Sequence, residues 1–163
     1  MRPVMMLLVS LNAGCPIWAV AQALDADGER LKSELIKAYR TPSPDAISAL
    51  LHPRSRACVR AEPKYERYLM RAETAQAVPP DAKVSVEPVA ADAPPPFRGF
   101  EFPVRPTHVV RMEFGRKPSA DGRSATTQIA EKHIARDGNR WHLVLPCATS
   151  EGLRRLGEMG LLN

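Results

Sequence analysis

Residues 126–147, TTQIAEKHIARDGNRWHLVLPC, contain two segments rich in apolar residues, separated by Asp137-Gly138-Asn139. Asp, Gly and Asn are the residues that tolerate the backbone conformations of tight turns. The pattern therefore predicts two antiparallel strands joined at this turn. We expect the rest of the chain to supply helices and strands that pack with this hairpin in one core.

The length of the hairpin loop decides which side chains share a face of the sheet, because a shift of one residue moves every side chain to the opposite face. A three-residue loop places Glu131 and His133 on the same face as Trp141. A loop of two or four residues instead places Lys132 on the tryptophan face and His133 on the other. Both registers are compatible with the sequence.

In the first register Glu131 and His133 form a candidate acid–base pair, with His108 contributed by the neighbouring strand. A carboxylate beside imidazoles in an apolar cavity is an arrangement in which pKa values shift and proton transfer becomes possible. The alternative interpretation is that these residues lie at a sheet edge and reach solvent. The sequence contains no phosphate-binding loop, dinucleotide-binding glycine motif, C-x-x-C or H-E-x-x-H, and its four histidines have no short metal-binding spacing, so no cofactor or metal is predicted.

Two further strands are predicted upstream of the hairpin. Residues 83–89 alternate between apolar and polar side chains, and residues 107–114 do the same, with His108, Val110, Met112 and Phe114 on one face. With the hairpin, these segments predict an α+β fold in which N-terminal helices pack on a curved antiparallel sheet of about four strands.

The helices are predicted from apolar residues at helical spacing. We expect helices over residues 25–39 (capped by Asp25 or Asp27), from Pro44 to about residue 51 (capped by Ser43), over residues 63–76, and over a short C-terminal segment capped by Ser150. Tyr65 and Tyr68 in the third helix are expected to pack against the sheet. Residues 54–60 are predicted to form a short strand.

A proline-rich loop, residues 90–106, separates the first two predicted strands. Pro94-Pro95-Pro96 is expected to be stiff and extended, while Phe97, Phe100 and Phe102 give the segment an apolar side. Such a loop either packs on the body of the domain or binds a partner. These three aromatic residues, together with Met112 and Trp141 as lining of a sheet cavity, are the predicted binding residues.

Length and charge restrict the functional class. A chain of 163 residues is long enough for one domain. The net charge of +5 arises from basic residues interleaved with acidic ones, with no Lys/Arg run longer than two. Such a distribution is typical of a mixed, solvated surface, and no nucleic-acid partner is predicted.

The N-terminus has the features of a secretory signal peptide. Arg2 precedes an apolar stretch that starts at residues 4–11, no acidic residue occurs before Asp25, and Ala21-Gln22-Ala23 fits a cleavage site. The prediction is a signal peptide over residues 1–23 and a mature domain over residues 24–163, with cleavage after Ala21 as the alternative. An uncleaved membrane anchor is the other interpretation, but Asn12, Gly14 and Pro16 interrupt the apolar stretch. No membrane span is expected after cleavage.

The predicted location is the bacterial periplasm. Lipid attachment at Cys15 is not expected, because Asn12 occupies the position where a lipoprotein signal has a branched apolar residue. Cleavage would leave Cys58 and Cys147, an even number in a compartment where disulfides persist, so a bridge between them is favoured over two buried thiols.

The order of elements resembles the nuclear transport factor 2-like (cystatin-like α+β cone) superfamily. Residues 45–53, DAISALLHP, are similar to an early helix ending in His-Pro in such domains, and residues 137–143, DGNRWHL, are similar to their last hairpin. The resemblance implies helices covering a bent sheet. It does not imply one function, because the superfamily includes isomerases, dehydratases, ligand-binding domains and assembly modules.

Two functions are compatible with these features, as is a structural domain that is held by the Cys58–Cys147 bridge and binds no ligand. The leading hypothesis is a non-catalytic exported module that binds a small apolar ligand or an envelope protein, with a homodimer as one possible assembly. The alternative is an enzyme of the isomerase or dehydratase type that acts on a small molecule through Glu131 and His133.

Overall fold

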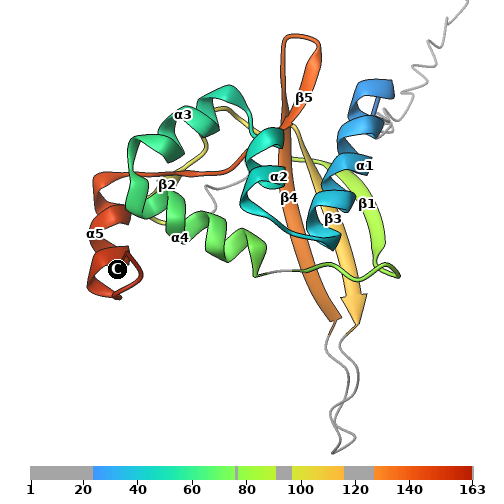
Figure 1. The fold of residues 1–163 in the computed structure, drawn as a ribbon. Coiled ribbons are helices and arrows are strands. Elements are labelled where there is room, and N and C mark those ends of the chain that lie inside the picture. The colour runs from blue at the N-terminus through green and yellow to red at the C-terminus, as the bar shows by residue number, and fades with distance from the viewer. Residues whose placement is uncertain (1–23, 76, 91–96, 116–126, 163) are drawn as a thin grey trace, which may run out of the picture.

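The computed structural model describes residues 24–75, 77–90, 97–115 and 127–162, and these residues form an α+β fold (Figure 1). The signal peptide over residues 1–23 and the triple proline at 94–96, both predicted above, lie outside the described residues. The elements, in chain order, are α1 Ala26–Arg40, α2 Pro44–Leu50, α3 Pro53–Ala61, α4 Pro63–Thr74, β1 Lys83–Pro88, β2 Phe100–Glu101, β3 His108–Gly115, β4 Thr127–Asp137, β5 Arg140–Leu143, β6 Cys147–Ala148 and α5 Ser150–Glu158.

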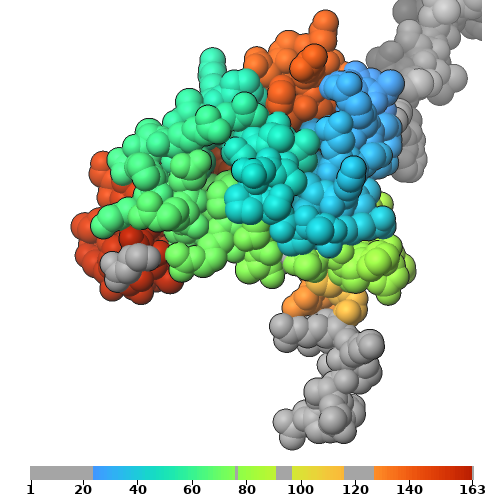
Figure 2. Space-filling model, in the orientation of Figure 1, coloured from blue at the N-terminus to red at the C-terminus, as the bar shows by residue number. Residues whose placement is uncertain are grey.

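The main sheet is antiparallel and has four strands in the order β1-β3-β4-β5. The alternation read from the sequence is confirmed in β3, where Val110 and Met112 are fully buried and Phe114 is nearly so. Helices lie against this sheet, and in the space-filling view they hide most of it (Figure 2). The predicted class, helices on an antiparallel sheet with a short C-terminal helix, is therefore confirmed.

The hairpin has a two-residue loop, Gly138-Asn139, so the second of the two predicted registers is the one observed. Asp137 pairs with Arg140 and Arg136 with Trp141. Gly138 has φ = 58°, as expected for glycine at the first turn position of a type II′ hairpin. Lys132 consequently faces the helices and is 6% exposed.

The helix starts are largely as predicted. Asp25 caps α1 by accepting a hydrogen bond from the Gly28 N–H at 3.0 Å, and Ser43 caps α2. The cap of α5 is Thr149, whose hydroxyl accepts from the Gly152 N–H at 3.3 Å; the prediction of Ser150 was wrong by one residue.

The prediction of a strand over residues 54–60 was wrong, since this segment is helix α3. Pro53 occupies its first turn, and the Nδ1 of His52 caps it by accepting from the Arg54 N–H at 3.1 Å. Ser55 and Val59 are its buried side chains, whereas Ala57 between them is exposed. A strand would place all three on one face, so this pattern suits a helix.

A second, two-stranded sheet joins β2 to β6 and lies beside α3 and α5. The segment 97–106, predicted as a loop, thus contains a short strand, Phe100–Glu101. Pairing of Phe100 with Ala148 and of Glu101 with Cys147 holds this segment against the C-terminal part of the chain.

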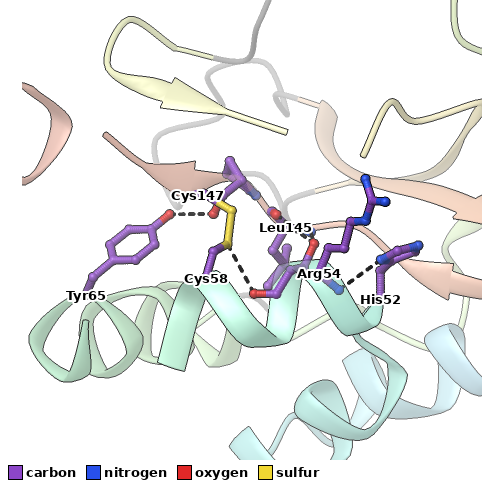
Figure 3. Close-up of a disulfide and its surroundings, with 8 residues drawn as sticks. His52, Arg54, Cys58, Tyr65, Leu145 and Cys147 are labelled. Atoms are coloured by element: carbon purple, nitrogen blue, oxygen red, sulfur yellow. Dashed lines mark hydrogen bonds between the residues drawn. A yellow bond between two sulfur atoms is a disulfide. The ribbon is translucent and has the colours of Figure 1, made fainter. Parts of the chain in front are cut away.

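The predicted pairing of Cys58 with Cys147 is present as a disulfide with a Cα–Cα distance of 5.8 Å. It connects α3 to β6 (Figure 3). On either side of it, the Tyr65 hydroxyl donates to the Pro146 carbonyl at 2.8 Å and the Ser55 hydroxyl donates to the Leu145 carbonyl at 3.0 Å. Among the described helices, none is both long and apolar enough to cross a membrane.

Candidate functional site

A groove of about 660 Å³ lies between α4, α5 and the segment that leads into β2. We call it the α4–α5 groove. Most of its lining is apolar or aromatic: Tyr65, Tyr68, Leu69, Phe97, Phe100, Pro146, Leu156 and Met159. Three charged residues, Arg98, Arg155 and Glu158, complete it. A concave, mainly apolar site with a few polar groups is typical of small-molecule binding sites, and this volume is within their usual range.

Helix α4 contributes one wall because Tyr65, Tyr68 and Leu69 recur at i, i+3 and i+4 and so share one helix face. The rings of Tyr65 and Tyr68 are stacked, with centroids 6.4 Å apart. Tyr65 is 1% exposed, and burial, followed by the neighbouring Tyr68, raises the pKa of its hydroxyl. Its hydroxyl is held by Pro146, so Tyr65 is a fixed part of the wall.

The opposite wall depends on a close backbone contact between two glycines. Gly99 has φ = 87°, and a Cβ on it would lie 2.8 Å from the Gly152 Cα. The Gly99 carbonyl also accepts hydrogen bonds from the Thr149 N–H at 3.0 Å and from its hydroxyl at 3.1 Å. Only glycine at both positions lets the 97–100 segment approach α5 this closely.

Two large apolar side chains of the groove are open to solvent. Phe97 is 71% exposed and Met159 is 62% exposed. The Phe97 ring contacts the edge of Phe100 at a centroid distance of 6.4 Å. Exposed apolar groups gathered in a concave site indicate a surface that another molecule covers.

The charges around the groove are mostly paired. Arg98 lies 3.1 Å from Glu151, and Glu158 is paired with Arg154. Arg155 differs, because its guanidinium donates to the backbone carbonyl of Arg98 at 3.4 Å and pairs with no carboxylate among the described residues. The groove therefore carries one positive charge that no acidic side chain of the described chain neutralises.

A second pocket, of about 370 Å³, lies beside β4 beyond the end of β5. Glu131 and His133 both line it, together with Phe102, whose ring lies 4.8 Å from that of His133. Burial lowers the pKa of His133. Glu131 is about half exposed and lies 3.5 Å from Arg111.

Lys132 and Glu73 also line this pocket and form a buried ion pair with a distance of 2.7 Å. The Tyr39 hydroxyl donates to the same carboxylate oxygen, and the Lys132 Nζ lies 4.4 Å from the Tyr39 ring centroid. Burial, followed by the negative charge of Glu73, raises the pKa of Tyr39. This cluster is not predicted from the sequence, because nothing local marks Glu73 as the partner of a residue 59 positions later.

The predicted catalytic residues are only partly brought together. Glu131 and His133 share the second pocket, whereas His108 pairs with Ile134 in the sheet and lies on the opposite face. There its ring meets the edge of Trp141 at 5.1 Å. The described residues contain no group of three or more His, Cys, Asp or Glu side chains that could bind a metal ion.

The predicted binding residues also separate. Phe97 and Phe100 line the α4–α5 groove, and Phe97 also lines the second pocket, together with Phe102. Met112 is fully buried in the core. Trp141 is 8% exposed and donates from its ring nitrogen to Asp25 at 2.9 Å. Both side chains belong to the buried apolar core cluster, and neither lines the groove or the second pocket.

Comparisons with protein-family models, with curated proteins and with solved structures find no match. The resemblance to the nuclear transport factor 2-like superfamily therefore stays a prediction. The groove and the second pocket are therefore the features from which a function can be inferred.

Proposed function

We propose that the protein is an exported, non-catalytic binding module that holds a small apolar ligand in the α4–α5 groove. The observation that carries this proposal is the concave surface built from Tyr68, Phe97, Phe100 and Met159, with Phe97 and Met159 left exposed. Burying exposed apolar surface is the main favourable contribution to binding a small apolar molecule.

Export is supported by the signal peptide read from the sequence and by the disulfide between Cys58 and Cys147, since such bridges persist in oxidising compartments. The same bridge restrains β6, which pairs with β2 and so positions one wall of the groove. The wall of the groove that contains β2 is therefore restrained in an oxidising compartment, where the bridge persists.

Fluorescence titration with N-phenyl-1-naphthylamine tests the proposal. The fluorescence of this neutral dye increases in apolar surroundings. The protein is purified after expression of the full chain, without further truncation. We expect saturable binding that Met159→Asp weakens about tenfold, because a carboxylate would then face the bound apolar ring. The matched control is Ile129→Asp, at an apolar residue that is 42% exposed and lies outside the groove. Absence of saturable binding, or equal loss in both variants, would contradict the proposal.

The second candidate is a small-molecule acid–base enzyme. The observation that favours it is that Glu131 and His133 line one pocket, with Phe102 covering the imidazole. Incorporation of solvent deuterium into a panel of small apolar ketones tests this function. An enzyme of this type predicts exchange that Glu131→Gln and His133→Asn both abolish; exchange that is absent, or equal in all three proteins, excludes it.

A further inference from the structure

The geometry points to a ligand class for the α4–α5 groove: we infer that it binds a single-chain amphiphile with an anionic head group, of which a medium-chain fatty acid is the simplest example. This inference rests on the proposed function. It goes beyond it by assigning the charge of the ligand and the residue that recognises that charge, Arg155.

The alkyl chain is the part of the ligand that the apolar lining accommodates. Tyr68, Phe97, Phe100, Leu156 and Met159 present rings and a flexible thioether with few polar atoms. A volume of about 660 Å³ suits one small molecule. Because each methylene that is fully buried strengthens binding about fourfold, affinity should rise with chain length by about twofold to fourfold per methylene in this partly open groove.

The head group is assigned from the charges of the groove. Glu158, the acidic residue of the lining, is paired with Arg154, and Glu151, which lies outside the lining, is paired with Arg98. Arg155 lies among the apolar lining residues and lacks a carboxylate partner in the described part of the chain. A guanidinium beside an apolar surface binds a carboxylate through charge-assisted hydrogen bonds while the chain of that ligand covers the rings.

Helix geometry places the charge at the correct position for this role. Met159, the C-cap of α5, follows Arg155 by four residues, and its N–H donates to the Arg155 carbonyl at 3.1 Å, so the guanidinium and the thioether lie one helical turn apart. An amphiphile lying along the helix can therefore contact both with one molecule. The proximity of Arg155 to Met159 distinguishes this site from a basic patch without apolar neighbours.

Displacement of N-phenyl-1-naphthylamine from the purified protein tests the inference, with laurate and dodecanol as ligands of equal chain length and different head groups. All concentrations are kept below the critical micelle concentration. We expect laurate to bind more tightly than dodecanol, and decanoate more weakly than laurate. Arg155→Gln should weaken laurate about threefold to fivefold, the upper range expected for losing one charged contact at an exposed site, and leave dodecanol unchanged. Arg140→Gln, at an exposed residue of the distant hairpin, is the matched control.

The outcomes separate the inference from the proposed function. If the dye does not bind, the proposed function itself fails. If the dye binds but laurate and dodecanol displace it equally, or Arg155→Gln weakens both to the same degree, the groove is an apolar site without head-group recognition and the inference is overturned. If the protein instead co-sediments with phosphatidylglycerol vesicles while laurate fails to displace the dye, the exposed residues contact a bilayer and the inference is likewise overturned.

Discussion

Removing the disulfide between Cys58 and Cys147 should lower stability more than any single side-chain replacement proposed for this protein. The bridge joins residues separated by 89 positions. In the chain-entropy model, closing a loop of this length stabilises the folded state by about 4–5 kcal/mol. Small domains have total stabilities of about 5–15 kcal/mol, so the bridge accounts for a large share.

Urea unfolding followed by far-UV circular dichroism, with and without reductant, measures this contribution. For a slope near 2 kcal/mol per molar urea, we expect the midpoint to fall by about 2–2.5 M on reduction. The variant Cys58→Ala/Cys147→Ala should unfold at the lower midpoint in both conditions, and alkylation with mass spectrometry verifies the redox state of each sample.

The bridge should also affect the groove directly. Reduction frees β6, whose pairing with β2 holds Phe100 over Gly152 and whose neighbour Pro146 fixes Tyr65. Dye binding should therefore weaken in the reduced protein under conditions in which its circular dichroism is still native. A midpoint shift below about 0.5 M together with unchanged dye binding would refute this account of the bridge.

Three further predictions concern single side chains or pairs of them, and a fourth concerns the N-terminus. Lys132→Met and Glu73→Gln should each destabilise the protein by about 3 kcal/mol because each leaves one buried charge uncompensated, and the double variant should recover part of the loss; additive losses in urea unfolding would exclude coupling. Because burial lowers the pKa of His133 below its unfolded value, the unfolded chain binds more protons below about pH 6.5, and the melting temperature should fall as pH decreases from there, less so in His133→Gln. Asp25→Ala should cost at least about 1–2 kcal/mol, because it removes the α1 cap together with the acceptor of the Trp141 ring N–H and the partner of Arg136. Asp25→Asn should retain the cap and most of this stability, and equal losses in urea unfolding would assign the effect to charge. N-terminal sequencing of protein from the envelope fraction should begin at Leu24, and an intact N-terminus there would contradict cleavage.

The features predicted correctly from sequence are those fixed by local chemistry. Asp25 and Ser43 cap helices because a short polar side chain can bond the nearby backbone N–H groups regardless of the tertiary structure. The alternation in 107–114 identified the buried face of β3, including Val110 and Met112. The prediction of a strand at residues 54–60 was wrong because this segment has few apolar residues, and because Pro53, which is favoured in the first turn of a helix, was not counted as a helix start.

The features that could not be predicted depend on contacts between distant segments. The aromatic half of the groove is visible in the sequence as Tyr65 and Tyr68 on one helix face and Phe97 and Phe100 in a loop, yet nothing local shows that α5 lies opposite them. The ion pair of Lys132 with Glu73 could be predicted only if the face of β4 that carries Lys132 were known. That face depends on the hairpin register, and the register depends on a loop length of two residues that the sequence left open.

The attachment of Asp25 and Asp27 to Trp141 has a consequence for the order of folding. The ring and backbone N–H groups of Trp141 donate to carboxylates that precede it by 116 and 114 positions. Such contacts have a high contact order, and the entropy of closing loops of this size must be lost before they form. Helix α1 can therefore complete its packing only after β5 has been synthesised, and a chain that ends before residue 140 lacks the strand that receives its first helix.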